Sequence, residues 1–110
     1  MQANSLIIIL TSVDSKDNAL SIAEILVSKK LAACVNILPG INSVYFWEGK
    51  LCNENEIIML IKTRTELFNS VKKQLLKIHP YKLPEIVSLS VPNALEAYSN
   101  WVFNETTIIK

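Results

Sequence analysis

The sequence predicts an α+β fold in which the elements follow the order βαββαβ and end with a short C-terminal helix. Strand-forming runs and amphipathic helical segments alternate along the chain in that order. The chain has 110 residues, of which 50% are apolar, which suits one domain with a core of its own. No linker, low-complexity segment or long repeat divides the sequence, so we expect a single domain over residues 1–110.

The first strand and helix are predicted from an apolar run and a periodic segment. Leu6–Leu10 is uninterrupted and β-branched, as is typical of a strand that is buried on both faces. Asp14-Ser15 offers an N-cap, and Asp17 places a negative charge in the first turn of a helix. Apolar residues then recur at helical spacing, at Ala19, Ile22, Ala23 and Leu26. This pattern predicts an amphipathic helix over residues 15–30.

A long hairpin is expected next. Residues 31–38 are mostly apolar, and strand-forming residues resume at 41–47 after Pro39-Gly40. We interpret these segments as one bent strand with a bulge or kink at Pro39-Gly40. Glu48-Gly49 is a turn signal, after which the chain pairs back from residue 50 and the return strand runs through 56–63.

The remaining elements complete the pattern. Thr65 is expected to cap a second helix, which Pro80 ends at His79. Residues 85–91 predict a fourth strand, and residues 94–103 predict a short terminal helix. The order is that of a ferredoxin-like sandwich, in which two helices pack on one face of a four-stranded antiparallel sheet.

The face of this sheet opposite the helices is expected to be buried by another chain. Residues 6–10 and 57–61 are apolar on both faces of their strands, whereas two helices cover only one face. Charged residues make up only 19% of the chain, and a small monomer of that composition would expose apolar patches. We therefore expect a closed homo-oligomer whose sheets face inward.

Composition and motifs argue against several classes of function. A net charge of +1 leaves no basic excess for nucleic acid, and no apolar run reaches the ~20 residues of a membrane helix. The N-terminal residues lack the pattern of a secretory signal, which predicts a cytoplasmic protein with reduced cysteines. Two glycines and one histidine provide neither a phosphate-binding glycine loop nor a nucleophile–base pair. An enzyme is therefore not expected.

His79 and Cys34 are the candidate metal ligands. His79 follows the predicted second helix, where a histidine serves either as a structural hydrogen-bonding residue or as a ligand of a soft metal. Cys34 lies in the predicted second strand, where it is either a small buried hydrophobe or a thiolate ligand for Cu(I). Cys52 lies near the hairpin tip, and no neighbour marks it as reactive.

Aromatic and charged residues suggest two further surfaces. Tyr45 and Trp47 near the hairpin tip, and Trp101 in the terminal helix, are candidate anchors of a subunit interface. Base stacking is the alternative for the hairpin aromatics, and the missing basic excess disfavours it. Lys62 and Arg64 at the end of the third strand form either a solvated rim or a small anion-binding cleft.

Four motifs resemble the CutA family of divalent-ion tolerance proteins, in the order and spacing of that family. They are Leu-Ala-Ala-Cys-Val-Asn at 31–36, Ser-Val-Tyr-Phe-Trp-Glu-Gly-Lys at 43–50, Ile-Lys-Thr-Arg at 61–64 and His-Pro-Tyr-Lys-Leu-Pro-Glu-Ile at 79–86. The resemblance extends over about residues 6–103. It implies a stable homotrimer similar in architecture to the PII signalling proteins, a link to copper and other divalent metals, and no catalytic reaction.

The resemblance also implies positions for a site. His79 and Cys34 fall in family motifs, and some members are proposed to bind copper through that histidine and a cysteine at the end of the first strand. Here that cysteine corresponds to Thr11, whose hydroxyl is a poorer copper ligand than a thiolate. A PII-like cleft between subunits would be lined by Lys62, His79, Tyr81 and Glu85 of one chain and by hairpin residues of the next.

Three functions follow as hypotheses. The first is a trimeric divalent-cation tolerance protein that binds copper or another divalent metal and needs no other cofactor. The alternative is a PII-like signalling protein that binds a small anionic ligand in an intersubunit cleft. The third is a scaffold whose chemistry is confined to its interface.

Overall fold

The computed structural model describes residues 5–107. The elements are β1 (Leu6–Val13), α1 (Lys16–Ser28), β2 (Cys34–Trp47), β3 (Lys50–Arg64), a 3-10 turn η1 (Thr65–Leu67), α2 (Phe68–Ile78), β4 (Val87–Ser90) and α3 (Glu96–Asn104). The four strands form one antiparallel sheet in the order β2-β3-β1-β4. This confirms the predicted α+β, ferredoxin-like arrangement with its C-terminal helix.

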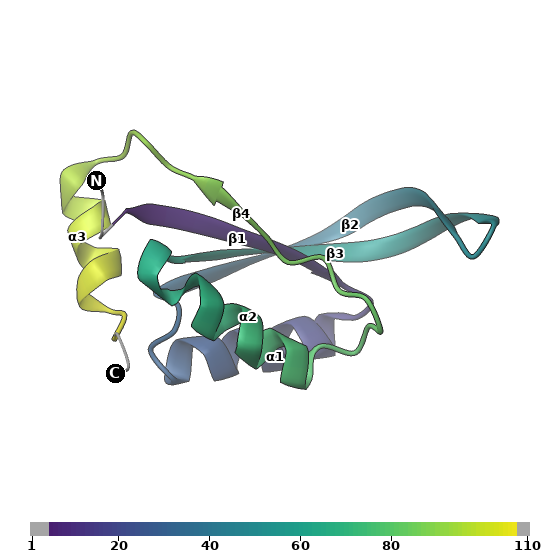
Figure 1. Cartoon of the computed structure of the whole chain (residues 1–110), viewed down its shortest axis with the longest axis horizontal. Coiled ribbons are helices and arrows are strands. Elements are labelled where there is room, and N and C mark those ends of the chain that lie inside the picture. Colours follow the sequence, from purple (N-terminus) through teal and green to yellow (C-terminus); the bar gives the residue numbers. More distant parts are fainter. Residues whose placement is uncertain (1–4, 108–110) are drawn as a thin grey trace.

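Helices α1 and α2 cover one face of the sheet, and α3 lies across the end of the sheet near the start of β1 (Figure 1). The core between sheet and helices is built from alternate residues of the central strands and from the apolar stripes of the helices. Its members include Ile7, Ile9, Met59, Ile61, Ile22, Leu26, Val71 and Leu75. The predicted apolar stripe of each helix therefore lies against the sheet.

The two predicted helix caps had different outcomes. Ser15 caps α1 as expected, because its hydroxyl accepts the N–H of Asn18 at 3.1 Å. The prediction that Thr65 caps the second helix is wrong. Its hydroxyl and its N–H both bond the carbonyl of Ser5, and Thr65 itself opens the 3-10 turn. Thr65 thus ties the end of β3 to the start of β1.

The long hairpin of β2 and β3 is confirmed. The strand register shifts between Leu38 and Ile41, where Gly40 has a φ of 78°, so the bulge lies at Pro39-Gly40 as predicted. Glu48 and Gly49 have φ values of 50° and 80° and form a two-residue turn. Between Ile57 and the turn, the hairpin has no third strand beside it in the described chain. This part of the hairpin projects from the body of the molecule (Figure 1).

Several element boundaries differ from the prediction, among them those of β2 and β4. The second strand begins at Cys34, because the N–H groups of Leu31 and Ala32 bond back to the carbonyl of Leu26 in α1. At this end of the helix Lys30 adopts a φ of 63°. The fourth strand is limited to Val87–Ser90, which pair with the middle of β1.

The sheet face opposite the helices, which we call the outer face, is apolar. Side chains alternate along each strand, so the neighbours of the core residues point to the outer face. Ile8, Leu10, Ile58 and Leu60 are half-buried there, and Leu38, Val87 and Leu89 have exposed fractions of 38%, 45% and 52%. Within residues 5–107, no helix is both long enough and apolar enough to span a membrane.

Candidate functional site

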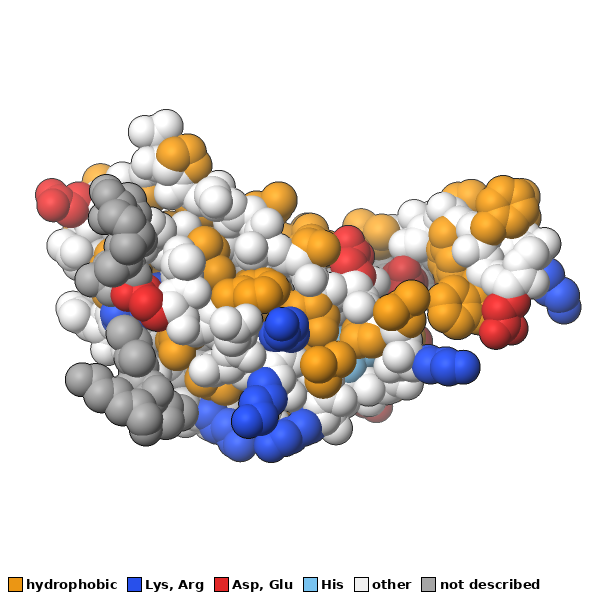
Figure 2. Space-filling model, viewed as in Figure 1, with side chains coloured by type: hydrophobic (Ala, Val, Ile, Leu, Met, Phe, Trp, Pro, Cys, Tyr) orange, Lys and Arg blue, Asp and Glu red, His pale blue; other side chains and the backbone are white. Residues whose placement is uncertain are grey.

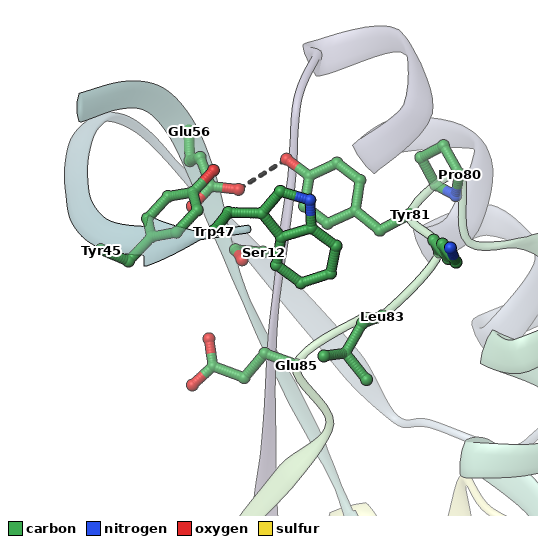
Figure 3. Close-up of a pocket in the computed structure, with 9 residues that line it drawn as sticks. Ser12, Tyr45, Trp47, Glu56, Pro80, Tyr81, Leu83 and Glu85 are labelled. Carbon is green, nitrogen blue, oxygen red and sulfur yellow. Dashed lines mark hydrogen bonds between the residues drawn. The ribbon is translucent and has the colours of Figure 1, made fainter. Parts of the chain in front are cut away.

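A cavity of about 490 Å³ lies where the hairpin leaves the body of the molecule. The hairpin contributes Tyr45 and Trp47 from β2 and Glu56 from β3, β1 contributes Ser12, and the α2–β4 loop contributes Pro80 to Leu83 and Glu85. Figure 3 shows the rings of Tyr45, Trp47 and Tyr81 gathered near Glu56. The volume is within the range of pockets that bind small molecules.

Local sequence explains how these side chains meet. Tyr45 and Trp47 are two positions apart on one strand, so both point to the same side of the hairpin. Pro80 favours the extended backbone of His79, which has a φ of −75° and a ψ of 134°, because proline restricts the residue before it. The segment after α2 runs along the base of the hairpin and brings Tyr81 and Glu85 to the cavity.

Tyr81 and Glu56 form the polar centre of the cavity. The phenol of Tyr81 donates a hydrogen bond to Glu56 Oε2 over 2.5 Å (Figure 3). Burial raises the pKa of Tyr81 well above its ordinary value, and the hydrogen bond and negative charge of Glu56 raise it further. Tyr81 is therefore a neutral hydrogen-bond donor at physiological pH.

His79 lies beside this cavity and is held by both ring nitrogens. Nε2 lies 2.9 Å from the carbonyl of Ser12 and 3.1 Å from Oγ1 of Thr11, and the N–H of Tyr81 donates to Nδ1 over 3.1 Å. Because Nδ1 accepts a proton donor, the neutral ring carries its hydrogen on Nε2 and donates it to Ser12. Burial lowers the pKa of His79 and so favours this neutral form.

The two predicted metal ligands lie on opposite faces of the sheet. Thr11 is fully buried on the helix side and has His79 beside it. Cys34 pairs with Lys62 on the neighbouring strand, and the alternation of side chains places both on the outer face. Within the described residues, no group of three or more His, Cys, Asp or Glu side chains is placed to hold a metal.

The residues predicted to line a cleft between subunits are divided in the structure. Tyr81 and Glu85 line the cavity, as do Tyr45 and Trp47, which were predicted at a subunit interface. Lys62 does not line it, since its Nζ lies 5.9 Å from the ring centroid of Tyr98 in α3. Trp101 lies in the same helix, with its ring centroid 5.7 Å from that of Tyr98.

The sequence reasoning missed Ser12 and Glu56 in this cavity. The signal for Glu56 was a carboxylate directly before the apolar run at 57–61, because charged side chains are seldom buried without a partner. With Glu56 and Glu85 opposing only Lys82, the lining carries more negative than positive charge. Figure 2 shows acidic side chains at the junction of body and hairpin. This balance disfavours the small anionic ligand that the sequence suggested.

Known proteins match this chain over most of its length. The sequence model of the family described as "CutA1 divalent ion tolerance protein" matches residues 7–105. A divalent-cation tolerance protein CutA from Thermus thermophilus is 39% identical over 99 residues, which cover 90% of this chain and 96% of that relative. The chloroplastic protein CutA 1 of Oryza sativa subsp. japonica is 38% identical over 100 residues, which cover 91% of this chain and 56% of that relative.

Solved structures give the same result. CutA1 from Oryza sativa superimposes with a TM-score of 0.92 at 36% identity, covering 97% of this chain and 98% of that one. A relative from Archaeoglobus fulgidus, described as a periplasmic divalent cation tolerance protein, has a TM-score of 0.88 at 36% identity and covers 91% of this chain and 97% of that one. Relatives are thus named for the chloroplast and the periplasm, and the cytoplasmic location stays a prediction. The family model, the identities and the shared fold establish that this chain belongs to the CutA1 divalent ion tolerance protein family.

Proposed function

We propose that this chain is a non-enzymatic divalent-cation tolerance protein that works as a homotrimer. The observation that carries the assembly is the apolar outer face of the sheet, where Leu38, Val87 and Leu89 are exposed. Monomeric proteins seldom leave such a face in water, and closed symmetric assembly of identical chains buries it. The number of three chains follows the resemblance of the sequence motifs.

The assembly is tested by mass in solution. Light scattering after gel filtration is expected to give three times the 12.4 kDa of the chain. The mass should hold on dilution through the micromolar range. A mass equal to one chain across that range would contradict the proposal.

For direct metal handling we propose Cys34 as the copper ligand, with His79 in a secondary role at most. Both ring nitrogens of His79 already have hydrogen-bond partners, so a metal would have to displace one of them. Cys34 is a free, half-buried thiol on the outer face, and thiolates suit Cu(I). A site on that face would recruit its further ligands from a neighbouring protomer.

A copper titration under reducing conditions, against a competing chelator, tests this ligand. Cys34→Ser is expected to abolish stoichiometric Cu(I) binding, and Cys52→Ser, which removes the other free thiol, should leave it intact. Binding that survives Cys34→Ser would overturn the assignment. Absence of binding in the unaltered, assembled protein would make the tolerance indirect.

A second candidate function is a sensor that binds a small molecule in the cavity beside the hairpin. It is favoured by the size of the cavity, about 490 Å³, and by its aromatic walls. This function is independent of copper binding at Cys34, which does not line the cavity.

A further inference from the structure

We propose that the cavity formed by Tyr45, Trp47, Glu56, Tyr81 and Glu85 binds a small organic cation, such as a quaternary ammonium group. The inference rests on the sensor candidate and specifies the class of its ligand. It does not depend on metal binding at Cys34. Three observations carry it: a buried carboxylate without a cationic partner, aromatic rings around that carboxylate, and the charge of the lining.

The first observation is the burial of Glu56. Its exposed fraction is only 9%, and its Oε2 accepts the hydroxyl of Tyr81. Between residues 5 and 107, however, the one ion pair within 4.0 Å joins Lys30 to Glu105, so no cation of this part of the chain neutralises Glu56. Carboxylates are seldom buried unless they are paired. The Tyr81 hydroxyl donates a hydrogen bond to one oxygen atom of Glu56 but does not neutralise its charge. A bound cation would neutralise it.

The second observation is the set of rings around this carboxylate. Tyr45 and Trp47 come from the hairpin and Tyr81 from the facing loop, and the indole of Trp47 lies beside the Glu56–Tyr81 pair (Figure 3). Aromatic faces attract weakly hydrated cations, and quaternary ammonium groups are bound in this way by aromatic cages. Trp and Tyr are the better of the aromatic residues for this contact.

The third observation is the net negative charge of the side chains that line the cavity. Glu85 adds a second carboxylate, whereas Lys82 is the only basic residue in the lining, so a cation is favoured over an anion. Calcium binds 6 to 8 oxygen ligands and magnesium needs near-octahedral geometry. The described residues offer no group of three metal-binding side chains here or elsewhere. Rings combined with two carboxylates fit an organic cation better than a bare metal ion.

A pair of probes of similar size and different charge tests the proposal. Tetramethylammonium chloride and tert-butanol are titrated into the assembled protein, with sodium chloride as the control for ionic strength. Binding is followed by the NMR signal of the Trp47 indole N–H, which Trp101→Phe distinguishes from that of the other tryptophan. We expect saturable shifts with tetramethylammonium, at an affinity at least tenfold above that for tert-butanol, because only the former gains the ionic and cation–π attraction. Sodium phosphate at matched ionic strength should produce no saturable shift.

Two variants identify the carboxylate responsible. Glu56→Gln removes the charge while keeping an oxygen for the Tyr81 hydroxyl, and it should weaken tetramethylammonium binding about tenfold or more. Glu54→Gln removes an exposed carboxylate of the same strand that does not line the cavity, and it should weaken binding far less than Glu56→Gln does.

Three results would overturn the proposal. They are equal binding of the two probes, no saturable shift of the Trp47 signal in the folded and assembled protein, and an equal loss in Glu56→Gln and Glu54→Gln. The comparison of probes needs no variant, so misfolding of Glu56→Gln would not leave the question open. Failure of either probe leaves trimer formation and copper binding at Cys34 untouched, because those are measured by mass and by chelator competition.

Discussion

Nε2 of His79 lies 3.1 Å from Oγ1 of Thr11, which joins the first residue after α2 to the end of β1. Thr11 is the position where the resemblance of the sequence motifs implies a copper-binding cysteine in some members, and the structure places it next to the histidine. The pair thus retains the geometry for a shared ligand set but has a hydroxyl where a thiolate would bind a soft metal.

Thr11→Cys is therefore expected to create a copper site with His79. The thiolate would lie within reach of Nε2, and we expect Cu(I) affinity to rise at least tenfold above that of the unaltered protein in chelator competition. Thr63→Cys is the matched control, because Thr63 is equally buried but bonds the carbonyl of Leu31, away from His79. Equal gains in both variants would show that any buried thiol suffices.

The stability of the protein is expected to fall as the pH drops from 7 towards 5, in part through His79. Burial lowers the pKa of this histidine in the folded chain below its ordinary value of 6.5, so the unfolded chain takes up the proton first. The stability due to neutral His79 is thus complete above 6.5 and is lost as the pH falls towards the folded pKa. Urea unfolding at fixed protein concentration measures this slope, and His79→Gln should reduce it. An unchanged slope in His79→Gln would assign the effect to other groups.

Removing the hydroxyl of Tyr81 should destabilise the protein. Tyr81→Phe leaves the buried carboxylate of Glu56 without its hydrogen-bond donor, at a cost of about 1–3 kcal/mol in the free energy of unfolding. Tyr45→Phe removes a hydroxyl from the same cavity at a more exposed residue, and it should change that free energy by less than about 0.5 kcal/mol. Equal losses in the two variants would contradict the role given to the Tyr81–Glu56 bond.

A charge on the outer face should disrupt the proposed trimer. Leu89→Lys places an ammonium group on β4 where the apolar face would be buried, so the mass measured by light scattering is expected to fall towards that of one chain. Leu76→Lys is the control, since Leu76 has an exposed fraction of 60% on α2, away from that face. An intact trimer from Leu89→Lys would place the interface elsewhere.

The hairpin and helices were predictable because local patterns determine them. Gly40 and Gly49 mark the bulge and the turn, and the apolar periods match the faces that are buried. The function of Thr65 was not predictable, because its bond to Ser5 joins residues 60 positions apart in the sequence. Helix capping is predicted from neighbouring residues, whereas the hydroxyl of Thr65 makes a tertiary contact instead.

Only part of the candidate site could be predicted from the sequence, because tertiary contacts bring the remaining residues to it. Tyr81 and Glu85 belong to one motif and were identified together, whereas Glu56 joins them through the path of the loop after α2. Strand alternation places Cys34 on the outer face, whereas His79 lies beside Thr11 on the helix side, so the two candidate ligands do not meet within one protomer. That alternation depends on the starting register of β2, which residue spacing alone does not fix.

The projecting end of the hairpin has a consequence for the order in which the protein becomes rigid. Residues 50–56 of β3 have β2 on one side and no strand on the other within the described chain, and a two-stranded ribbon by itself is only marginally stable in water. Its backbone amides should therefore exchange with deuterium far sooner than those of Ile57 to Thr63 in an isolated protomer. If the exchange of these amides slows as the protein concentration rises, the hairpin becomes rigid only when chains associate.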